Sequence, residues 1–216
     1  MSGLTRYVSQ RRQRHLSYAM EVCLVGLLVV GIVTGSVGVI VNTVVALAVI
    51  QLPALLQRDY KLPMDPRLTL WITSAAFFHA VGLVGIPWTD VNFYSEVWWW
   101  DHVTHALSAS VVAAVGYATV RAVDKHSEEV YLPPAFISVL VLVFVLAFGV
   151  LWELLEFGVG IIAESFGTTE VLTQYGAEDT LMDLVFNTLG GIVVAIWGGV
   201  YLTDLSDAIT DQLDKR

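Results

Sequence analysis

The sequence predicts an all-α protein, a six-helix transmembrane bundle whose N-terminus and C-terminus are both cytoplasmic. Composition is the first observation: of 216 residues, 56% are hydrophobic and only 14% are charged, whereas a soluble domain usually carries about 25% charged residues. The second is a series of apolar runs long enough to cross a bilayer. The third is the placement of lysine and arginine, which falls on one side of the predicted spans.

The first apolar run covers residues 22–56 and is too long for a single crossing. As one helix it would measure about 52 Å, against about 30 Å for the hydrocarbon core of a bilayer. The glycines of GSVG at 35–38 suit a tight turn, so we expect two short spans at about 20–35 and 38–57. Because the run is much longer than the apolar part of a signal peptide, we expect it to be retained.

Four further apolar runs complete the predicted bundle, at about 67–88, 102–121, 134–157 and 179–203. No alternation of apolar and polar residues favours a strand. Prolines stand near the ends of the spans, where a missing N–H is harmless: Pro63, Pro66, Pro87, Pro133 and Pro134.

The six spans are expected to form one transmembrane domain, residues 19–204. Residues 1–18 are rich in arginine and are predicted to be a cytoplasmic juxtamembrane segment that lies on anionic headgroups. Residues 205–216 are predicted to be a cytoplasmic tail, at most a short amphipathic helix.

The distribution of basic residues supports six spans and a cytoplasmic N-terminus. With that topology, every lysine and arginine lies on the cytoplasmic side, as the positive-inside rule requires. The predicted external segments, near 36, at 88–101 and at 158–178, contain none. Tryptophans gather at the predicted outer boundary as an aromatic belt: Trp88, Trp98, Trp99 and Trp100. The basic residues are Arg6, Arg11, Arg12, Arg14, Arg58, Lys61, Arg67, Arg121, Lys125, Lys215 and Arg216.

The net charge of −9, with only three lysines, disfavours nucleic acid as a partner, because nucleic acid selects basic surfaces. The expected partner is the lipid bilayer of the plasma membrane. Acidic loops with so little lysine also suit a high-salt environment. The single Cys23 lies in an apolar run and is interpreted as a small core residue.

Ionisable and amide side chains recur in the outer half of four predicted spans. In three of these spans the residues pair at spacings of three or four, so each of the three sets shares roughly one helix face. At about 1.5 Å per residue, these positions lie at similar depths near the outer surface. The sets are Asp101, His102 and His105; Glu153 and Glu156; Asp179, Asp183 and Asn187; and the single His79.

Some of these residues also have simpler interpretations. Asp101 and Asp179 begin their helices, where a carboxylate caps the helix or favours its dipole. His79 is also interpreted as a hydrogen-bonded residue of the bundle interior. His105, Glu153 and Asp183 lie a turn inside the apolar region on three different helices, where ionisable residues mark function.

Carboxylates crowded together need a positive charge nearby to balance their negative charge, because without one they cannot all ionise. No lysine or arginine lies on that side, so a divalent metal such as Zn, Mn or Fe is one solution. The predicted ligands are Asp101, His102, His105, Asp179 and Asp183, with Glu153 and Glu156 as catalytic carboxylates and Asn187 and His79 as supporting polar groups. Protons are the alternative: some carboxylates would stay neutral, as in a proton relay.

Three motifs occur in the order WDxxTH (100–105), WExxE (152–156) and DxxxDxxxNxxG (179–190). In these motifs the chain resembles the YjdF-like family of small multi-pass membrane proteins. The resemblance covers roughly residues 60–200, and the first hairpin matches in hydropathy alone. It implies an integral membrane bundle with these polar positions and implies no particular activity.

Three kinds of function are compatible with this pattern. The first is a metal-dependent hydrolase or transferase that acts on a lipid or small amphiphile, with Glu153 or Glu156 as general base. The second is a proton- or cation-coupled transporter, although the inner halves of the spans lack ionisable partners. The third is a non-catalytic membrane scaffold, in which a metal or hydrogen bonds hold the helices together.

Overall fold

The computed structural model describes residues 9–85, 91–165, 172 and 175–215. Within these ranges the chain is helical, and no strand is formed apart from one isolated bridge between Gly85 and Asn92. The helices are α1 (Gln10–Thr34), α2 (Val37–Val49), α3 (Leu52–Asp59), α4 (Pro66–Gly82), α5 (Phe93–Glu96), α6 (Trp100–His126), α7 (Pro134–Ser165), α8 (Ala177–Tyr201) and α9 (Thr203–Leu213).

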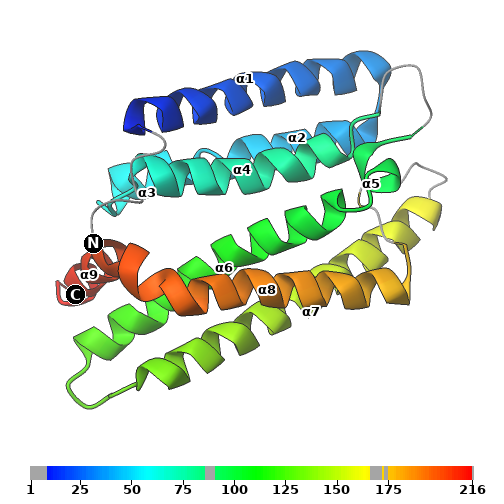
Figure 1. The fold of residues 1–216 in the computed structure, drawn as a ribbon. Helices are drawn as coiled ribbons and strands as arrows, with labels where there is room; N and C mark the ends of the chain where they lie inside the picture. The colour runs from blue at the N-terminus through cyan, green and yellow to red at the C-terminus, as the bar shows by residue number, and fades with distance from the viewer. Residues whose placement is uncertain (1–8, 86–90, 166–171, 173–174, 216) are drawn as a thin grey trace.

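The long helices lie side by side and alternate in direction (Figure 1). α1, α4 and α7 run one way, and α2, α6 and α8 run the other. As a result, the start of α6, the end of α7 and the start of α8 lie at one end of the bundle. The start of α1, the short helix α3 and α9 lie at the opposite end.

In the described part of the chain, five segments are long and apolar enough to cross a membrane: α1, the α2–α3 segment Val37–Asp59, α6, α7 and α8. α4, with 17 residues, is shorter than these. The multi-pass helical class is therefore confirmed. The sixth crossing, the cytoplasmic placement of both termini and the division at residues 18 and 204 stay predictions.

The turn expected in GSVG forms between α1 and α2. Gly35 has φ 69, the left-handed conformation that glycine adopts without steric cost. The N–H of Ser36 donates to the carbonyl of Gly31, and its side chain caps the start of α2 at Val39. A helical hairpin therefore replaces one over-long span, as the length argument predicts.

The second predicted span, 38–57, is interrupted in the structure. α2 ends at Val49, and α3 begins at Leu52. Pro53 lies at the start of α3; it has no N–H to donate and its ring would clash with the carbonyl four residues earlier, at Val49. The proline therefore divides the span that hydropathy alone treats as continuous.

Other boundaries also differ from those expected. α1 begins at Gln10, α6 continues to His126 and α7 to Ser165, each beyond the predicted apolar limits. Hydropathy marks the apolar part of a helix, whereas hydrogen bonding continues into the polar flanks. Four residues used in the sequence argument lie outside the described residues: Arg6, Pro87, Trp88 and Arg216.

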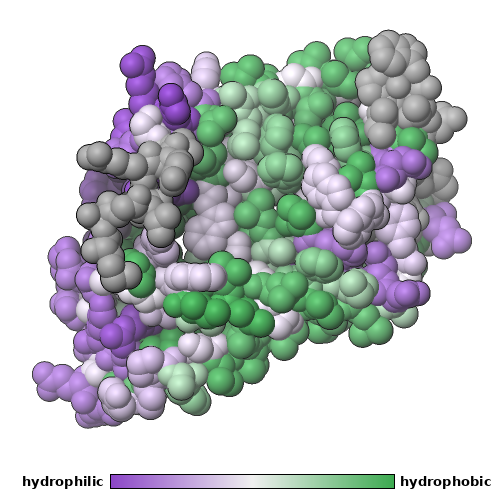
Figure 2. All heavy atoms as spheres, viewed as in Figure 1, coloured by the Kyte–Doolittle hydropathy of each residue, from purple (hydrophilic) through white to green (hydrophobic). Residues whose placement is uncertain are grey.

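The outer surface of the bundle is apolar. Figure 2 shows hydrophobic residues over the middle of the visible face and hydrophilic residues toward its ends. Large aliphatic side chains such as Leu151, Leu181 and Val200 are more than half exposed. A surface of this extent would be unstable in water but suits contact with lipid chains.

Small residues let the helices approach closely. One core, between α6, α7 and α8, contains Ala109, Ala113, Ile137, Val141 and Val194, and a second, between α1, α2 and α4, contains Leu24, Ala46, Ile50 and Ala80. At Gly190 of α8, an added Cβ would lie 2.2 Å from the carbonyl oxygen of Ala106 on α6. Glycine is therefore required at this crossing, which is the typical way membrane helices pack.

Candidate metal site

The candidate site lies at the end of the bundle where α6 and α8 begin. Trp100 holds the start of α6 in place, because its indole N–H donates to the carbonyl of Phe78 on α4 at 3.1 Å. The Trp100 ring also stacks on Phe93, with ring centroids 4.7 Å apart. From this start α6 packs extensively on α8.

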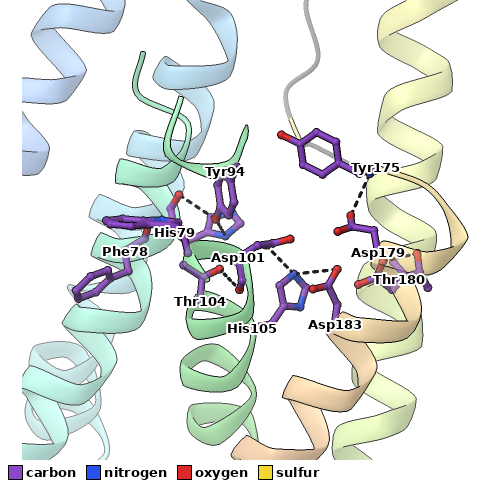
Figure 3. Close-up of polar contacts among 12 residues, drawn as sticks. Phe78, His79, Tyr94, Asp101, Thr104, His105, Tyr175, Asp179, Thr180 and Asp183 are labelled. Carbon is purple, nitrogen blue, oxygen red and sulfur yellow. Dashed lines mark hydrogen bonds and ion pairs between the residues drawn. The ribbon is translucent and has the colours of Figure 1, made fainter. Parts of the chain in front are cut away.

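His105 of α6 lies between two carboxylates (Figure 3). Its Nε2 is 3.5 Å from Asp101 Oδ1 on the same helix and 3.8 Å from Asp183 Oδ2 on α8. Two ligand atoms that each lie about 2.1 Å from a tetrahedral zinc ion are about 3.4 Å apart. The spacing of these three groups is therefore close to that of a metal site.

α7 adds a second group that shares His105. Ligand atoms of His105, Glu153 and Glu156 all lie within 4.8 Å of one another, as do those of Asp101, His105 and Asp183. Glu153 is oriented from α8, because Thr180 Oγ1 donates to its Oε2 at 2.9 Å. Four carboxylates from three helices thus surround one imidazole.

These acids are withdrawn from solvent. Asp183 is 1% exposed, Glu153 5% and Glu156 6%. Among the described residues, Asp183 Oδ1 and Glu153 Oε1 have no hydrogen-bond donor. Buried carboxylate oxygens without a partner are costly, so both oxygens require a cation, a proton or a water molecule beside them.

No basic side chain is available to supply that cation. The sequence contains no lysine or arginine at 68–120 or at 126–214, which includes all of α7 and α8. Among the described residues, the arginines and lysines that form ion pairs with acids are Arg58, Arg121 and Lys125, at the opposite end of the bundle. The charge of the acidic cluster must therefore be balanced by a bound ion or by protons.

Two of the predicted ligands lie at the edge of this cluster. Asp179 accepts a hydrogen bond from the backbone N–H of Tyr175 at 3.0 Å, at the start of α8. The His102 ring stacks on Phe186, with centroids 4.3 Å apart, and its Nδ1 is buried without a partner among the described residues. Neither belongs to the two groups whose geometry could hold a metal ion, and their roles as ligands stay predictions.

The two predicted supporting residues face the bundle interior. His79 Nε2 lies 3.2 Å from Asn42 Oδ1, and the hydroxyl of Tyr94 lies 3.0 Å from His79 Nδ1. These contacts are those of a hydrogen-bonded interior residue. Asn187 is 4% exposed and faces α7, where a Cβ on Gly149 would be 2.8 Å from its amide nitrogen.

Sequence reasoning missed three residues of this region: Asn42, Tyr94 and Thr180. Asn42 could have been found, because it is a lone amide in a strongly apolar span. Thr180 lies beside Asp179 in the third motif but gives no periodic signal of its own. Tyr94 lies on the short helix α5, whose contact with α4 is a tertiary feature.

Comparison with protein-family models supports the membrane class. The family model described as predicted membrane protein (DUF2238) matches residues 15–204, which includes the first hairpin. A protein of Thermotoga maritima described as uncharacterised is 30% identical over 129 residues, 60% of this chain and 60% of the relative. No solved structure matches. The chain therefore belongs to the DUF2238 family of membrane proteins, which is the YjdF-like family that its three motifs resemble.

Proposed function

We propose that this protein binds a divalent metal ion among Asp101, His105, Glu153, Glu156 and Asp183, and uses it to hydrolyse an ester of a lipid or small amphiphile. One observation carries the proposal: in the described part of the chain, four carboxylates from three helices, three of them buried, surround one imidazole, and two of their oxygens lack hydrogen-bond donors. A mixed set of nitrogen and oxygen ligands suits Zn, Mn or Fe.

The bound metal would lower the pKa of a coordinated water and polarise the ester oxygen. We assign Glu156 as the general base, because Glu153 is oriented by Thr180 at one oxygen and its other oxygen, which has no donor among the described residues, is left to bind the metal. Glu156 would accept a proton from the attacking water and return it to the departing alcohol, while the metal, when bound, would supply the Lewis acidity that favours attack on the ester. The products are an acid and an alcohol, so no further co-reactant is needed.

We place the site at the extracytoplasmic face of the plasma membrane. Basic residues gather at the opposite end of the bundle, near the starts of α1 and α4 and the end of α6. Because such residues prefer the cytoplasmic side of a membrane, the site is proposed to lie on the other side.

Elemental analysis of purified protein tests metal binding. We expect wild-type protein to carry metal, and His105→Ala to lose it, because His105 belongs to both ligand groups. Asp211→Ala, an exposed acid on α9, is the control and should retain the wild-type content. Equal metal content in all three proteins would disprove the proposal.

Glu156→Gln separates catalysis from binding. In metal-loaded protein reconstituted in lipid nanodiscs, hydrolysis of medium-chain p-nitrophenyl carboxylic and phosphoric esters is expected to fall at least about 100-fold, the contribution of a positioned general base. Rates are compared at saturating metal, with the bound metal measured in the same sample, so that a lower rate is not caused by lost metal. A wild-type protein that binds metal but hydrolyses none of these esters would contradict a hydrolase and favour the scaffold or transport alternatives.

A further inference from the structure

We propose that the cavity beside the acidic cluster binds the hydrocarbon chain of a single-chain amphiphile and directs its polar group to the metal. The inference rests on the proposed function for the metal, but concerns a separate surface. The proposed substrate is a molecule with one alkyl chain. The depth of the cavity would determine which chain lengths bind best.

The cavity has a volume of about 260 Å³ and lies between α2, α4, α6, α7 and α8. It meets the candidate site at His105, which both lines the cavity and belongs to the two ligand groups. Asn42, His79 and Asn187 also line this end. The cavity therefore begins at a polar rim that contains a metal ligand.

Away from this rim the lining becomes apolar on four of the five helices, and α8 contributes only Asn187 at the rim. On each of four helices, the lining residue seven positions farther from the site is aliphatic, and seven residues of helix rise by about 10 Å. The pairs are Asn42 and Val49 on α2, His79 and Ile72 on α4, His105 and Val112 on α6, and Trp152 and Val145 on α7. A pocket that is polar at one end and apolar at the other matches an amphiphile and not a hydrated ion.

The cavity is accessible from the bilayer between α2 and α7. Val45 on α2 and Phe148 on α7 both line it, yet they are 56% and 44% exposed. These two helices do not pack extensively on one another in the described part of the chain. An alkyl chain can therefore enter sideways from lipid while its polar group stays near the membrane surface.

The size of the cavity favours one chain. A volume of 260 Å³ is below the range of about 300–1,000 Å³ typical of pockets for drug-sized ligands. It cannot hold both chains of a diacyl lipid, and its depth of about 10 Å suits a chain of short or medium length. Chains longer than the pocket must extend back into the bilayer.

Alkyl hydroxamates of increasing chain length are suitable probes, because the hydroxamate binds metal and the chain reports on the cavity. Their binding is measured with metal-loaded protein in diacyl-lipid nanodiscs, and the signal of empty nanodiscs is subtracted to remove partitioning. For wild-type protein we expect affinity to rise with chain length and then reach a plateau. Val112→Phe fills the deep end of the cavity, so the plateau should come at a shorter chain and the longest probes should bind at least tenfold more weakly.

Val115→Phe is the matched control. Val115 lies one turn farther along α6 and is 58% exposed, outside the cavity lining, so the same substitution should leave the profile unchanged. If Val112→Phe and Val115→Phe behave alike, or if wild-type affinity is independent of chain length, the inference is wrong even when metal is bound. If no metal is present in the wild type, the proposed function fails instead, and elemental analysis of the same samples distinguishes the two results.

Discussion

Gly190→Ala is expected to destabilise the bundle by about 3 kcal/mol, the upper end of the usual cost of overpacking. The added methyl group would lie 2.2 Å from the carbonyl oxygen of Ala106 and 3.1 Å from the backbone nitrogen of Ser110. Both neighbours are backbone atoms of α6, so no side chain can rotate away. α6 and α8 must separate, which also moves His105 away from Asp183. The measurement is thermal unfolding in detergent, together with metal content.

Gly158→Ala provides the matched control for this substitution. Gly158 lies within α7, and a Cβ there has no neighbour within 4 Å. Since alanine favours a helix over glycine by about 1 kcal/mol, this variant should be as stable as the wild type or slightly more stable. A Gly190→Ala protein that unfolds at the wild-type temperature would show that α6 and α8 do not cross as closely as described.

Asp183→Asn is expected to have opposite consequences with and without metal. Asp183 is almost fully buried and one of its oxygens has no donor. In chelator, asparagine removes a negative charge from a cluster of acids and adds an N–H donor, so stability should be unchanged or rise by about 1 kcal/mol. With metal, the variant loses a ligand, and its affinity for the ion should fall at least about 100-fold, beyond the loss typical for outer-shell partners.

Thermal unfolding across a titration of Zn²⁺ or Mn²⁺ measures both effects. A ligand present at 100 times its dissociation constant stabilises the native state by about 2.7 kcal/mol, and this gain should be seen for wild-type protein and be almost absent for Asp183→Asn. Asp204→Asn, an exposed acid at the start of α9, should respond as the wild type does. If the chelated Asp183→Asn protein is markedly less stable than the wild type, the acids do not repel one another and the argument for a cation is lost.

The spacing of Asp101, His105, Glu153 and Asp183 could be predicted because helical periodicity is local. Residues three or four apart share a helix face whatever the helix packs against, and hydropathy restricts that face to a depth in the bilayer. The same argument treated His102 and His105 as equivalent ligands, because both lie near the start of one helix. In the structure His102 stacks on Phe186, whereas His105 lies between two acids.

By itself, the sequence determined the membrane class, the hairpin at Gly35 and the helix faces that carry acids and imidazoles, since each depends on composition or on residues within a few positions. Only the tertiary structure decided which acids surround His105, that Asn42 and Tyr94 contact His79, and that an apolar cavity lies beside the site. These features depend on how far apart the helices lie. That distance is set by close contacts such as Gly190 against Ala106, between residues far apart in the chain, which no local pattern encodes.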